Sequence, residues 1–439
     1  MYRINKDTIL STEEIQAYID AHEITDFPRL QKLYDYYTGN HEILNRTMKD
    51  SSKPNNKLIH QLPKYITTVH TGYFIGKPVT YSATDEGAEL LDNLKYVFDE
   101  NDEQALNAEI ANSCSIYGKA YEMLYIDEDK EVRSAILDTR YVIPLYSNTI
   151  QSELIAVIRY YYEQGILDDE PTLYVEYYNR ETINQYQKIG DKLALIASNP
   201  HFIAALPIVE YRNNKECSGD FEGVISLVDA YEKINSDSLN DFEAFVDSYL
   251  VLSGMQGTEP SEIQAMKENR VLLPPDGASA NWLTKQVQDA HVENMKNRLA
   301  KEILKLSATP DMGDEAFGGN LSGIAIKYKL MMLESQTSTT ERWFKKGLQQ
   351  RIYLICSIFK LLGADYDYRT IKIAFNRNIP ANATEAATLI NTLRGIISNQ
   401  TALEQLPFID DVQAEVERIE AEAAMTGFDI TAGGDTVEE

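Results

Sequence analysis

The chain has 439 residues, 44% of them hydrophobic, which is enough for one large domain or for two to three ordinary domains with apolar cores. Its 41 basic and 68 acidic side chains give a formal net charge of −27, which excludes general attraction to nucleic acid through overall charge. The three cysteines, Cys114, Cys217 and Cys356, are sparse and include no CxxC pair, which disfavours a disulfide framework.

No targeting or membrane segment is predicted. The opening MYRINKDTILSTEEI lacks the apolar core of a signal peptide. The longest apolar stretch, Ile352 to Leu362, is interrupted by Lys360 and is too short to span a bilayer. We therefore expect a protein that is assembled in the cytoplasm and has no membrane contact.

Residues 1–117 are predicted to be mainly helical. Ser11 or Thr12 can cap a first helix that carries Glu14 in its first turn. Apolar residues recur at helical spacing between Leu58 and Ile75, which predicts another helix. Two more polar helices are expected at about 85–99 and 101–116.

The pattern changes to short strands from Ala120 onward. The segments AYEMLYI, EVRSAIL, LIAVIRYYY, TLYVEYYN and TINQYQK are rich in β-branched and aromatic residues and are separated by turns, which predicts a run of antiparallel strands. The stretch from Asp127 to Glu131 has the acidity of a calcium loop but lacks that motif's central glycine and downstream glutamate. We interpret it as a hairpin turn.

Long helices dominate the second half of the chain. A helix over 221–249 would be roughly 44 Å long, and one over 321–362 roughly 63 Å. Between them we expect strands at YLVLSG, RVLLPP and NWLTKQ around a small helix at 260–269, then a helix at 289–307 and a glycine-rich loop at 309–323. A strand at 369–376, helices at about 382–397 and 410–425 and a flexible tail at 426–439 complete an α+β chain.

A search for catalytic motifs finds none. Gly76-Lys77-Pro78 and Gly118-Lys119-Ala120 fail as P-loops, GNLSG at 319–323 is not a nucleophile elbow, and there is no HExxH metal motif. The six histidines have no helical metal spacing and are interpreted as surface or structural residues. The sequence therefore predicts no enzyme, no cofactor and no metal site.

One group of basic residues stands out in the acidic chain. Arg298, Lys301 and Lys305 share one face of the predicted 289–307 helix. Lys327 and Lys329 begin the next helix. Val292, Met295, Leu299, Ile303 and Leu306 lie on the opposite face from the basic line. The basic line is either a solvated helix face or a contact for a polyanion, and the spacing alone favours the solvated face.

Several blocks, in order, resemble portal proteins of long-tailed bacteriophages. The first are LYDYYTGNHEILNR at 33–46 and KPNNKLIHQLPKYITTVHTGYFIGKPVTY at 53–81. DFEGVISLVDAYEKINSDSLNDFEAFVDSYLVLSG is similar to the family's descending stem helix, and GGNLSGIAIKYKLMMLE to its tunnel-loop exit and long kinked helix. IKIAFNRNIPANATEAATLI is similar to its returning wing strand and the following helix.

The resemblance implies a division of the chain. A wing would take residues 1–220 and a strand near 369–376, with stem helices at 221–249 and 289–307 and a clip at 250–288. A tunnel loop at 310–320, a long kinked wing helix at 321–362, a helical crown at 380–425 and the tail would follow.

The resemblance also implies a role. The family forms twelve-membered rings at a capsid vertex of the virion, through which double-stranded DNA passes without sequence specificity. Its partners are the terminase large subunit, a head-completion or adaptor protein, and the scaffold and major capsid proteins. Assembly would take place in the host cytoplasm.

We expect the five basic residues to face or flank this DNA channel. The tunnel loop would be formed by Asp311, Met312, Gly313, Asp314, Glu315, Ala316 and Phe317. Because this loop is acidic, steric contact by Met312 or Phe317 suits it better than phosphate binding. The alternatives are another ring component of the phage neck and an acidic intracellular enzyme with an unrecognised site.

Overall fold

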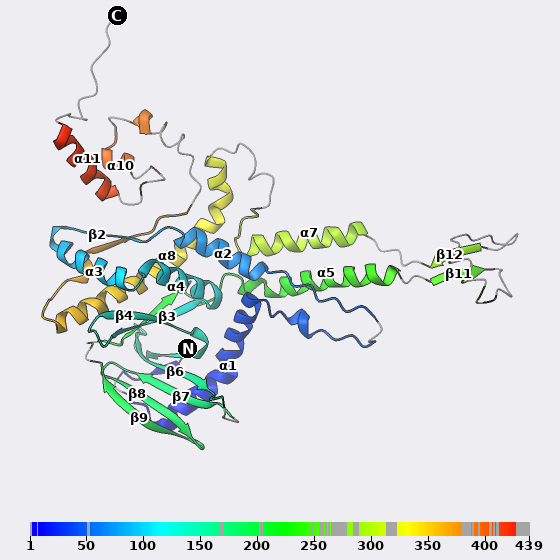
Figure 1. The fold of residues 1–439 in the computed structure, drawn as a ribbon, viewed down its shortest axis with the longest axis horizontal. Coiled ribbons are helices and arrows are strands. Elements are labelled where there is room, and N and C mark those ends of the chain that lie inside the picture. Colours follow the sequence, from blue (N-terminus) through cyan, green and yellow to red (C-terminus); the bar gives the residue numbers. More distant parts are fainter. Residues whose placement is uncertain are drawn as a thin grey trace, which may run out of the picture.

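A computed structural model describes residues 2–426 except for 7, 51–52, 167–169, 202, 204, 247–248, 254–258, 260, 262–263, 265–278, 284–288, 313–322, 379–387, 389, 394–395, 404–405, 407–408 and 410–411. The chain mixes helices with sheets that are mostly antiparallel, in agreement with the expected α+β class. Figure 1 shows a mixed body from which two helices project together.

The N-terminal segment is a strand followed by a long helix. Strand β1 (Tyr2–Ile4) precedes α1 (Thr12–Thr38). Ser11 is the N-cap: its side-chain oxygen accepts a hydrogen bond from the Glu14 backbone N–H at 3.2 Å, and Glu14 Oε2 accepts one from the Ser11 backbone N–H at 2.8 Å. The helix ends at Gly39, whose φ of +94° is readily adopted only by glycine.

A six-stranded sheet packs against α1. Its order is β1-β5-β6-β7-β8-β9, with β1 parallel to β5 and the other neighbours antiparallel. Ile15 and Ile19 of α1 are buried in one cluster with Ile158 and Val175 of the sheet. The strands after β1 are β5 (Val142–Ser147), β6 (Leu154–Glu163), β7 (Thr172–Tyr178), β8 (Thr182–Ile189) and β9 (Lys192–Pro200). The 3-10 turn η3 (Thr139–Tyr141) leads into β5.

A second sheet of three strands lies at the centre of the body. Its order is β10-β3-β4, with all neighbours antiparallel, and its strands are β3 (Lys119–Ile126), β4 (Val132–Leu137) and β10 (Ile208–Arg212). Residues 127–131 join β3 to β4, which confirms the hairpin interpretation. Asp127 Oδ1 accepts hydrogen bonds from the backbone N–H groups of Asp129 and Glu131 at 3.0 and 2.8 Å, so this carboxylate stabilises the turn.

Helices cover this central sheet and enclose the largest apolar core. Phe344 of α8 packs with Tyr211 of β10 and Phe74 of α2. Gly347 permits the close approach of α8 to β10, since an added Cβ would lie 2.3 Å from the Tyr211 ring. The helices are α2 (Leu62–Ile75), α3 (Ala88–Glu100), α4 (Glu103–Tyr117) and α8 (Gly323–Leu361).

A short two-stranded sheet brings a late segment back to the body. Strand β13 (Ile371–Ala374) pairs antiparallel with β2 (Thr80–Ala83), almost 290 residues earlier in the chain. The predicted strand at 369–376 is thus confirmed, and its partner is now known. The 3-10 turns η2 (Asp85–Gly87) and η6 (Tyr368–Thr370) lie beside these strands.

Two helices project side by side from the body, as Figure 1 shows. They are α5 (Ile225–Val246), which follows the 3-10 turn η4 (Glu222–Val224), and α7 (Asp289–Leu306). Strands β11 (Tyr249–Ser253) and β12 (Ser279–Leu283) pair antiparallel at their far end. Both helices and β11 lie within a few residues of their predicted bounds, whereas β12 begins two residues before the strand predicted at NWLTKQ.

The segment between α1 and α2, which joins the portal-like blocks at 33–46 and 53–81, contacts α5. The 3-10 turn η1 (Glu42–Asn45) begins after His41, whose Nδ1 lies 2.6 Å from Glu232 Oε1 in a fully buried pair. The Asn56 backbone N–H donates to Asn240 Oδ1 at 2.8 Å. These contacts give the two portal-like sequence blocks a structural role, because they hold α5 against the segment between α1 and α2.

The C-terminal part contributes the helices α10 (Asn399–Leu403) and α11 (Val412–Thr426). The latter confirms the helix expected at 410–425. Other expectations lie outside the described residues. These are the strand at RVLLPP, most of the helices at 260–269 and 382–397, and the tail beyond residue 426.

Candidate nucleic-acid interface

The basic line of α7 is an exposed helix face. Arg298, Lys301 and Lys305 are all exposed, and with Asn294, Asn297 and Glu302 they line a shallow depression. Arg298 Nε donates a hydrogen bond to Glu302 Oε1 at 2.9 Å, one turn along the helix. Because this ion pair is solvent-exposed, it contributes little stability and leaves the face with a positive balance.

The opposite face of α7 is only partly covered. Leu299 and Ile303 are buried, and Ile303 packs in one cluster with Val228 of α5. Met295 and Leu306, which the pattern placed on the same apolar face, are 42% and 66% exposed. Within one chain α7 packs mainly against α5 and η4, so only a narrow stripe of its apolar residues is covered.

The segment that leaves α7 is anchored on α2. The Ser307 carbonyl accepts a hydrogen bond from His70 Nε2 at 2.9 Å, and the Thr309 hydroxyl lies 3.1 Å from the same nitrogen. Immediately after Thr309, the Tyr65 hydroxyl donates to the Pro310 carbonyl and accepts from the Met312 backbone N–H, both at 3.4 Å. The chain direction at the start of the expected tunnel loop is therefore set by polar side chains of α2.

A buried carboxylate extends this anchor. His70 Nδ1 lies 3.6 Å from Asp220 Oδ2, and both side chains are almost fully buried. Asp220 also accepts hydrogen bonds from Ser115 Oγ at 2.6 Å, Asn213 Nδ2 at 2.7 Å and Gln336 Nε2 at 2.8 Å. Since a buried charge is stable only with such partners, the network holds α2, α4 and α8 in one arrangement.

The structure describes only some of the other site residues that the sequence predicted. Lys327 is exposed and Lys329 is half-buried, both near the beginning of α8. Asp311 is exposed, and Met312 is 49% exposed. The other tunnel-loop residues, Gly313, Asp314, Glu315, Ala316 and Phe317, lie outside the described residues.

Sequence reasoning did not identify His70, Tyr65 and Asp220 as positioning residues. A signal existed for His70, because it lies four residues after the buried Ile66 on the same face of α2. A histidine on a buried face needs a polar partner. The partners come from segments near 220 and 307, which no local pattern connects to residue 70.

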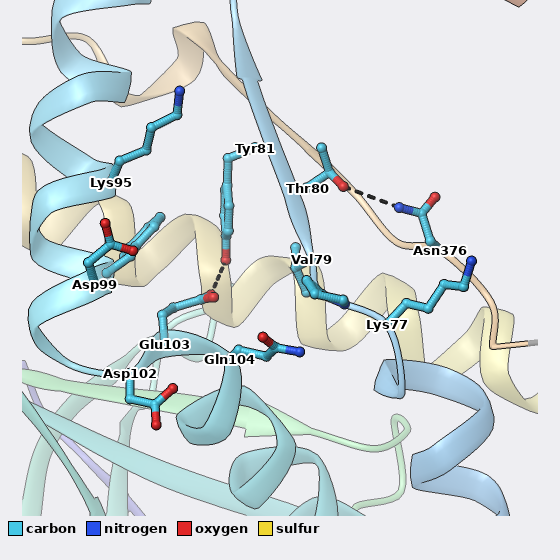
Figure 2. Close-up of a pocket in the computed structure, with 12 residues that line it drawn as sticks. Lys77, Val79, Thr80, Tyr81, Lys95, Asp99, Asp102, Glu103, Gln104 and Asn376 are labelled. Carbon is cyan, nitrogen blue, oxygen red and sulfur yellow. Dashed lines mark hydrogen bonds between the residues drawn. The ribbon is translucent and has the colours of Figure 1, made fainter. Parts of the chain in front are cut away.

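A cavity of about 480 Å³ lies between β2, α3 and the start of α4, away from the basic face of α7 (Figure 2). Lys77 and Lys95 line it together with Asp99 and Asp102, so its charges are mixed. Figure 2 shows the Tyr81 hydroxyl directed at Glu103, to which it donates a hydrogen bond.

Glu103 is committed to structural contacts. The same carboxylate accepts a hydrogen bond from Asn107 Nδ2 and lies 3.2 Å from Arg351 Nη1. Because these contacts use its hydrogen-bonding capacity within the fold, Glu103 has a structural role in this cavity.

Two searches of the described part of the chain were negative. No group of three or more histidine, cysteine or acidic side chains there is arranged to hold a metal ion. Within the same residues, no helix has the length and apolarity needed to cross a bilayer.

Comparison with known proteins gives one consistent result. The family model described as "Phage portal protein, SPP1 Gp6-like" matches residues 16–427. The portal protein of Bacillus phage SPP1 is 25% identical over 462 residues, covering 98% of this chain and 91% of that protein. The portal protein of Clostridium phage phiCD119 is 26% identical over 447 residues, covering 93% and 95%. Since the family match takes in nearly the whole chain, including both projecting helices and the anchored segment after them, the chain belongs to the phage portal protein family.

Proposed function

We propose that the chain is the subunit of a twelve-membered portal ring, through which double-stranded DNA enters the capsid and leaves it. The observation that carries the proposal is the family match over residues 16–427. The paired projecting helices, closed at their tip by a β-ribbon, suit a stem that lines a channel. The ring would occupy one vertex of the virion capsid after assembly in the host cytoplasm.

The division of the chain follows its elements. The wing is residues 1–220 with β13, and α5 and α7 form the stem. The β11–β12 ribbon belongs to a clip at 250–288. Residues 310–320 form the tunnel loop, α8 is the long wing helix, and residues 380–425, including α10 and α11, form the crown. Support comes from the element bounds at three of these limits: η4 begins at Glu222, α7 begins at Asp289 and α8 begins at Gly323.

The basic face of α7 is proposed to contact DNA in the channel. Arg298, Lys301 and Lys305 are exposed on a helix fixed to the body at its C-terminal end, with Lys327 and Lys329 beyond the loop. In a chain of net charge −27, a few cations would hold the phosphates weakly. Weak contact suits a conduit, because DNA must slide through it.

The anchors at Tyr65 and His70 support a second element of the proposal. They fix where the tunnel loop begins relative to α2, while α8 begins where the loop ends. The loop would therefore act as a tethered constriction around DNA, with Met312 and Phe317 in steric contact with it.

The proposed partners follow from the same role. The clip would dock the terminase large subunit during packaging and a head-completion or adaptor protein afterwards. The wing would contact the scaffold and major capsid proteins. The energy for DNA movement would come from the terminase.

Electron microscopy of the purified protein tests the proposal. We expect rings of about twelve subunits with an open axial channel, and reconstruction would place α7 against that channel. Monomers or dimers at every protein and salt concentration would contradict the ring. Rings with Lys301 and Lys305 on the outer wall would leave the ring in place and contradict the DNA-contact assignment.

A further inference from the structure

A large groove lies on the body, away from the projecting helices. It has a volume of about 1000 Å³ and is bounded by β10, by residues 343–353 of α8 and by the turn between β5 and β6. Its cationic residues are Arg3, Arg180, Arg212, Lys215 and Lys346, and its carboxylates are Glu153 and Glu210. The groove is thus positive in a chain whose net charge is −27.

An aromatic surface lines the groove between these cations. Lys346 Nζ lies 4.0 Å from the centre of the Trp343 ring, and the Arg212 guanidinium lies 5.6 Å from it. Tyr146 donates a hydrogen bond from its hydroxyl to Glu210. Tryptophan, tyrosine and arginine are the residue types that dominate the energetics of protein interfaces, so this surface suits protein contact.

Internal ion pairs leave part of the positive charge uncompensated. Arg212 pairs with Glu210 at 2.6 Å, and Arg180 lies 3.7 Å from Glu153, which also pairs with Lys6. Within the described part of the chain, Arg3, Lys215 and Lys346 make no ion pair, and all three are exposed. An occupant that brings carboxylates would satisfy these cations.

An acidic projection on the same chain has matching chemistry. The β3–β4 turn carries four acidic residues and one lysine over Asp127–Glu131, and Glu128 and Asp129 at its tip are exposed. Beside the tip, Tyr125 and Ile126 are 38% and 41% exposed, which supplies an apolar contact for Trp343. Because Asp127 holds the turn by two backbone hydrogen bonds, the projection is already shaped for docking.

We propose that the acidic β3–β4 turn of one copy docks into the basic groove around Trp343 of the next copy. The turn does not line the groove of its own chain, so it would have to reach the groove of a second copy. A contact between two different surfaces of identical chains is heterologous, and it propagates into a ring when its rotation closes. The inference rests on the ring proposed above and identifies one contact within it.

Nucleic acid suits this groove less well. Glu153 and Glu210 lie among the cations and would repel the phosphates of a duplex. A peptide turn presents only a few carboxylates at fixed positions, so these can contact the cations without lying beside Glu153 or Glu210.

Charge exchange between the two surfaces tests the docking. One variant reverses the groove (Lys215→Glu with Lys346→Glu), a second reverses the turn (Glu128→Lys with Asp129→Lys), and a third combines all four changes. Lys188→Glu with Lys192→Glu, at the exposed tip of the β8–β9 hairpin, is the matched control. Circular dichroism establishes that each variant is folded, and mass photometry measures ring assembly.

We expect each reversed surface to raise the protein concentration needed for half assembly by about tenfold. The control should assemble like the original chain, and the combined variant should recover most of the loss. Unchanged ring assembly in both reversed variants would overturn the docking. So would a loss of ring assembly in the reversed variants that the combined variant does not recover. So would normal rings whose groove variant has lost binding to a 30-bp duplex, since the groove would then serve DNA. If the original chain forms no ring, the proposed function fails first, and this inference fails with it.

Discussion

At the scale of single residues, buried histidines carry much of the positioning. His70 joins the end of α7 to Asp220, His41 pairs with Glu232 on α5, and His22 Nδ1 lies 3.0 Å from the Tyr160 hydroxyl. The three environments differ, because His41 and His70 each lie beside a carboxylate oxygen, whereas the direct partner of His22 is a phenol hydroxyl. They therefore respond differently to substitution and to pH.

Replacement of His70 by alanine is expected to destabilise the chain by about 1–3 kcal/mol, because the Ser307 carbonyl and Asp220 would each lose a buried partner. Urea unfolding followed by circular dichroism measures the change. His291→Ala is the matched control, since His291 is exposed on α7. Equal unfolding midpoints for the two variants would show that the anchor contributes no stability.

The stability of the chain should depend on pH through His22. Burial lowers the pKa of His22 to about 4, although the charge of Asp26 opposes the shift. A lowered pKa means that the unfolded state binds the proton more tightly, so this stabilisation is present above pH 6.5 and is lost as the pH falls toward 4. Between pH 6.5 and 5.5 His22 should account for a loss of about 1 kcal/mol in the free energy of unfolding.

The comparison of the original chain with His22→Gln isolates this effect. The variant should lose less stability over that pH interval, whereas His291→Gln should behave like the original chain. His41 contributes with the opposite sign. Burial lowers its pKa, but its hydrogen bond to Glu232 and the charge of that residue outweigh burial and raise the pKa overall. A pH response that is identical in all three proteins would refute the assignment to His22.

At the scale of elements, a buried ion triad joins α8 to the central sheet. Arg351 of α8 lies 2.9 Å from Glu122 of β3 and 3.2 Å from Glu103 of α4, and all three are buried. Arg351 Nη1 also donates to Asn107 Oδ1 at 2.7 Å. This contact complements the apolar packing of Phe344 and sets the rotation of α8 about its axis.

Arg351→Met should cost about 3–5 kcal/mol, because it leaves two carboxylates buried without their cation. Arg342→Met is the control on the same helix, since Arg342 is exposed. Adding Glu103→Gln and Glu122→Gln to Arg351→Met should restore part of the lost stability, as the buried charges are then removed. Thermal unfolding of the four proteins checks this order, and a triple variant less stable than Arg351→Met would contradict it.

At the scale of the whole molecule, the net negative charge and the local basic face have opposite effects on DNA binding. The net charge of −27 opposes general DNA binding, whereas α7 carries three exposed cations on one face. The proposed ring would repeat this face around the channel. Binding should therefore be weak, strongly dependent on salt and independent of sequence.

Lys301→Glu with Lys305→Glu should weaken the binding of assembled rings to a 30-bp duplex. For every phosphate that a substituted lysine no longer neutralises, the slope of log affinity against log salt should become shallower by about 0.9. Fluorescence anisotropy over a salt series measures the slope, with Lys188→Glu and Lys192→Glu as the control of equal charge. An unchanged slope in rings of normal size would place the DNA-binding surface elsewhere.

The sequence by itself determined the elements that depend on local pattern. The helix start at Ser11 or Thr12, the β3–β4 hairpin, the two projecting helices and the shared face of Arg298, Lys301 and Lys305 all follow from spacing within a few turns of chain. The structure decided between the two caps in favour of Ser11. Five blocks in order also identified the family, because they extend over most of the chain. Among the strands that the structure describes, β1, β2, β5, β9 and β10 were not predicted.

Only the tertiary structure decided which distant segments meet. β1 pairs with β5 more than 140 residues away, and β2 pairs with β13 almost 290 residues away. Turn residues in the sequence therefore cannot predict either pair. The same holds for His70 with Ser307 and Asp220, and for the groove that places Arg3 near Trp343. Local propensity acts over a few residues, whereas burial and ion pairing depend on which surfaces the fold brings together. For that reason the sequence identified the kind of protein, and the folded chain identified the residues that position its proposed DNA contact.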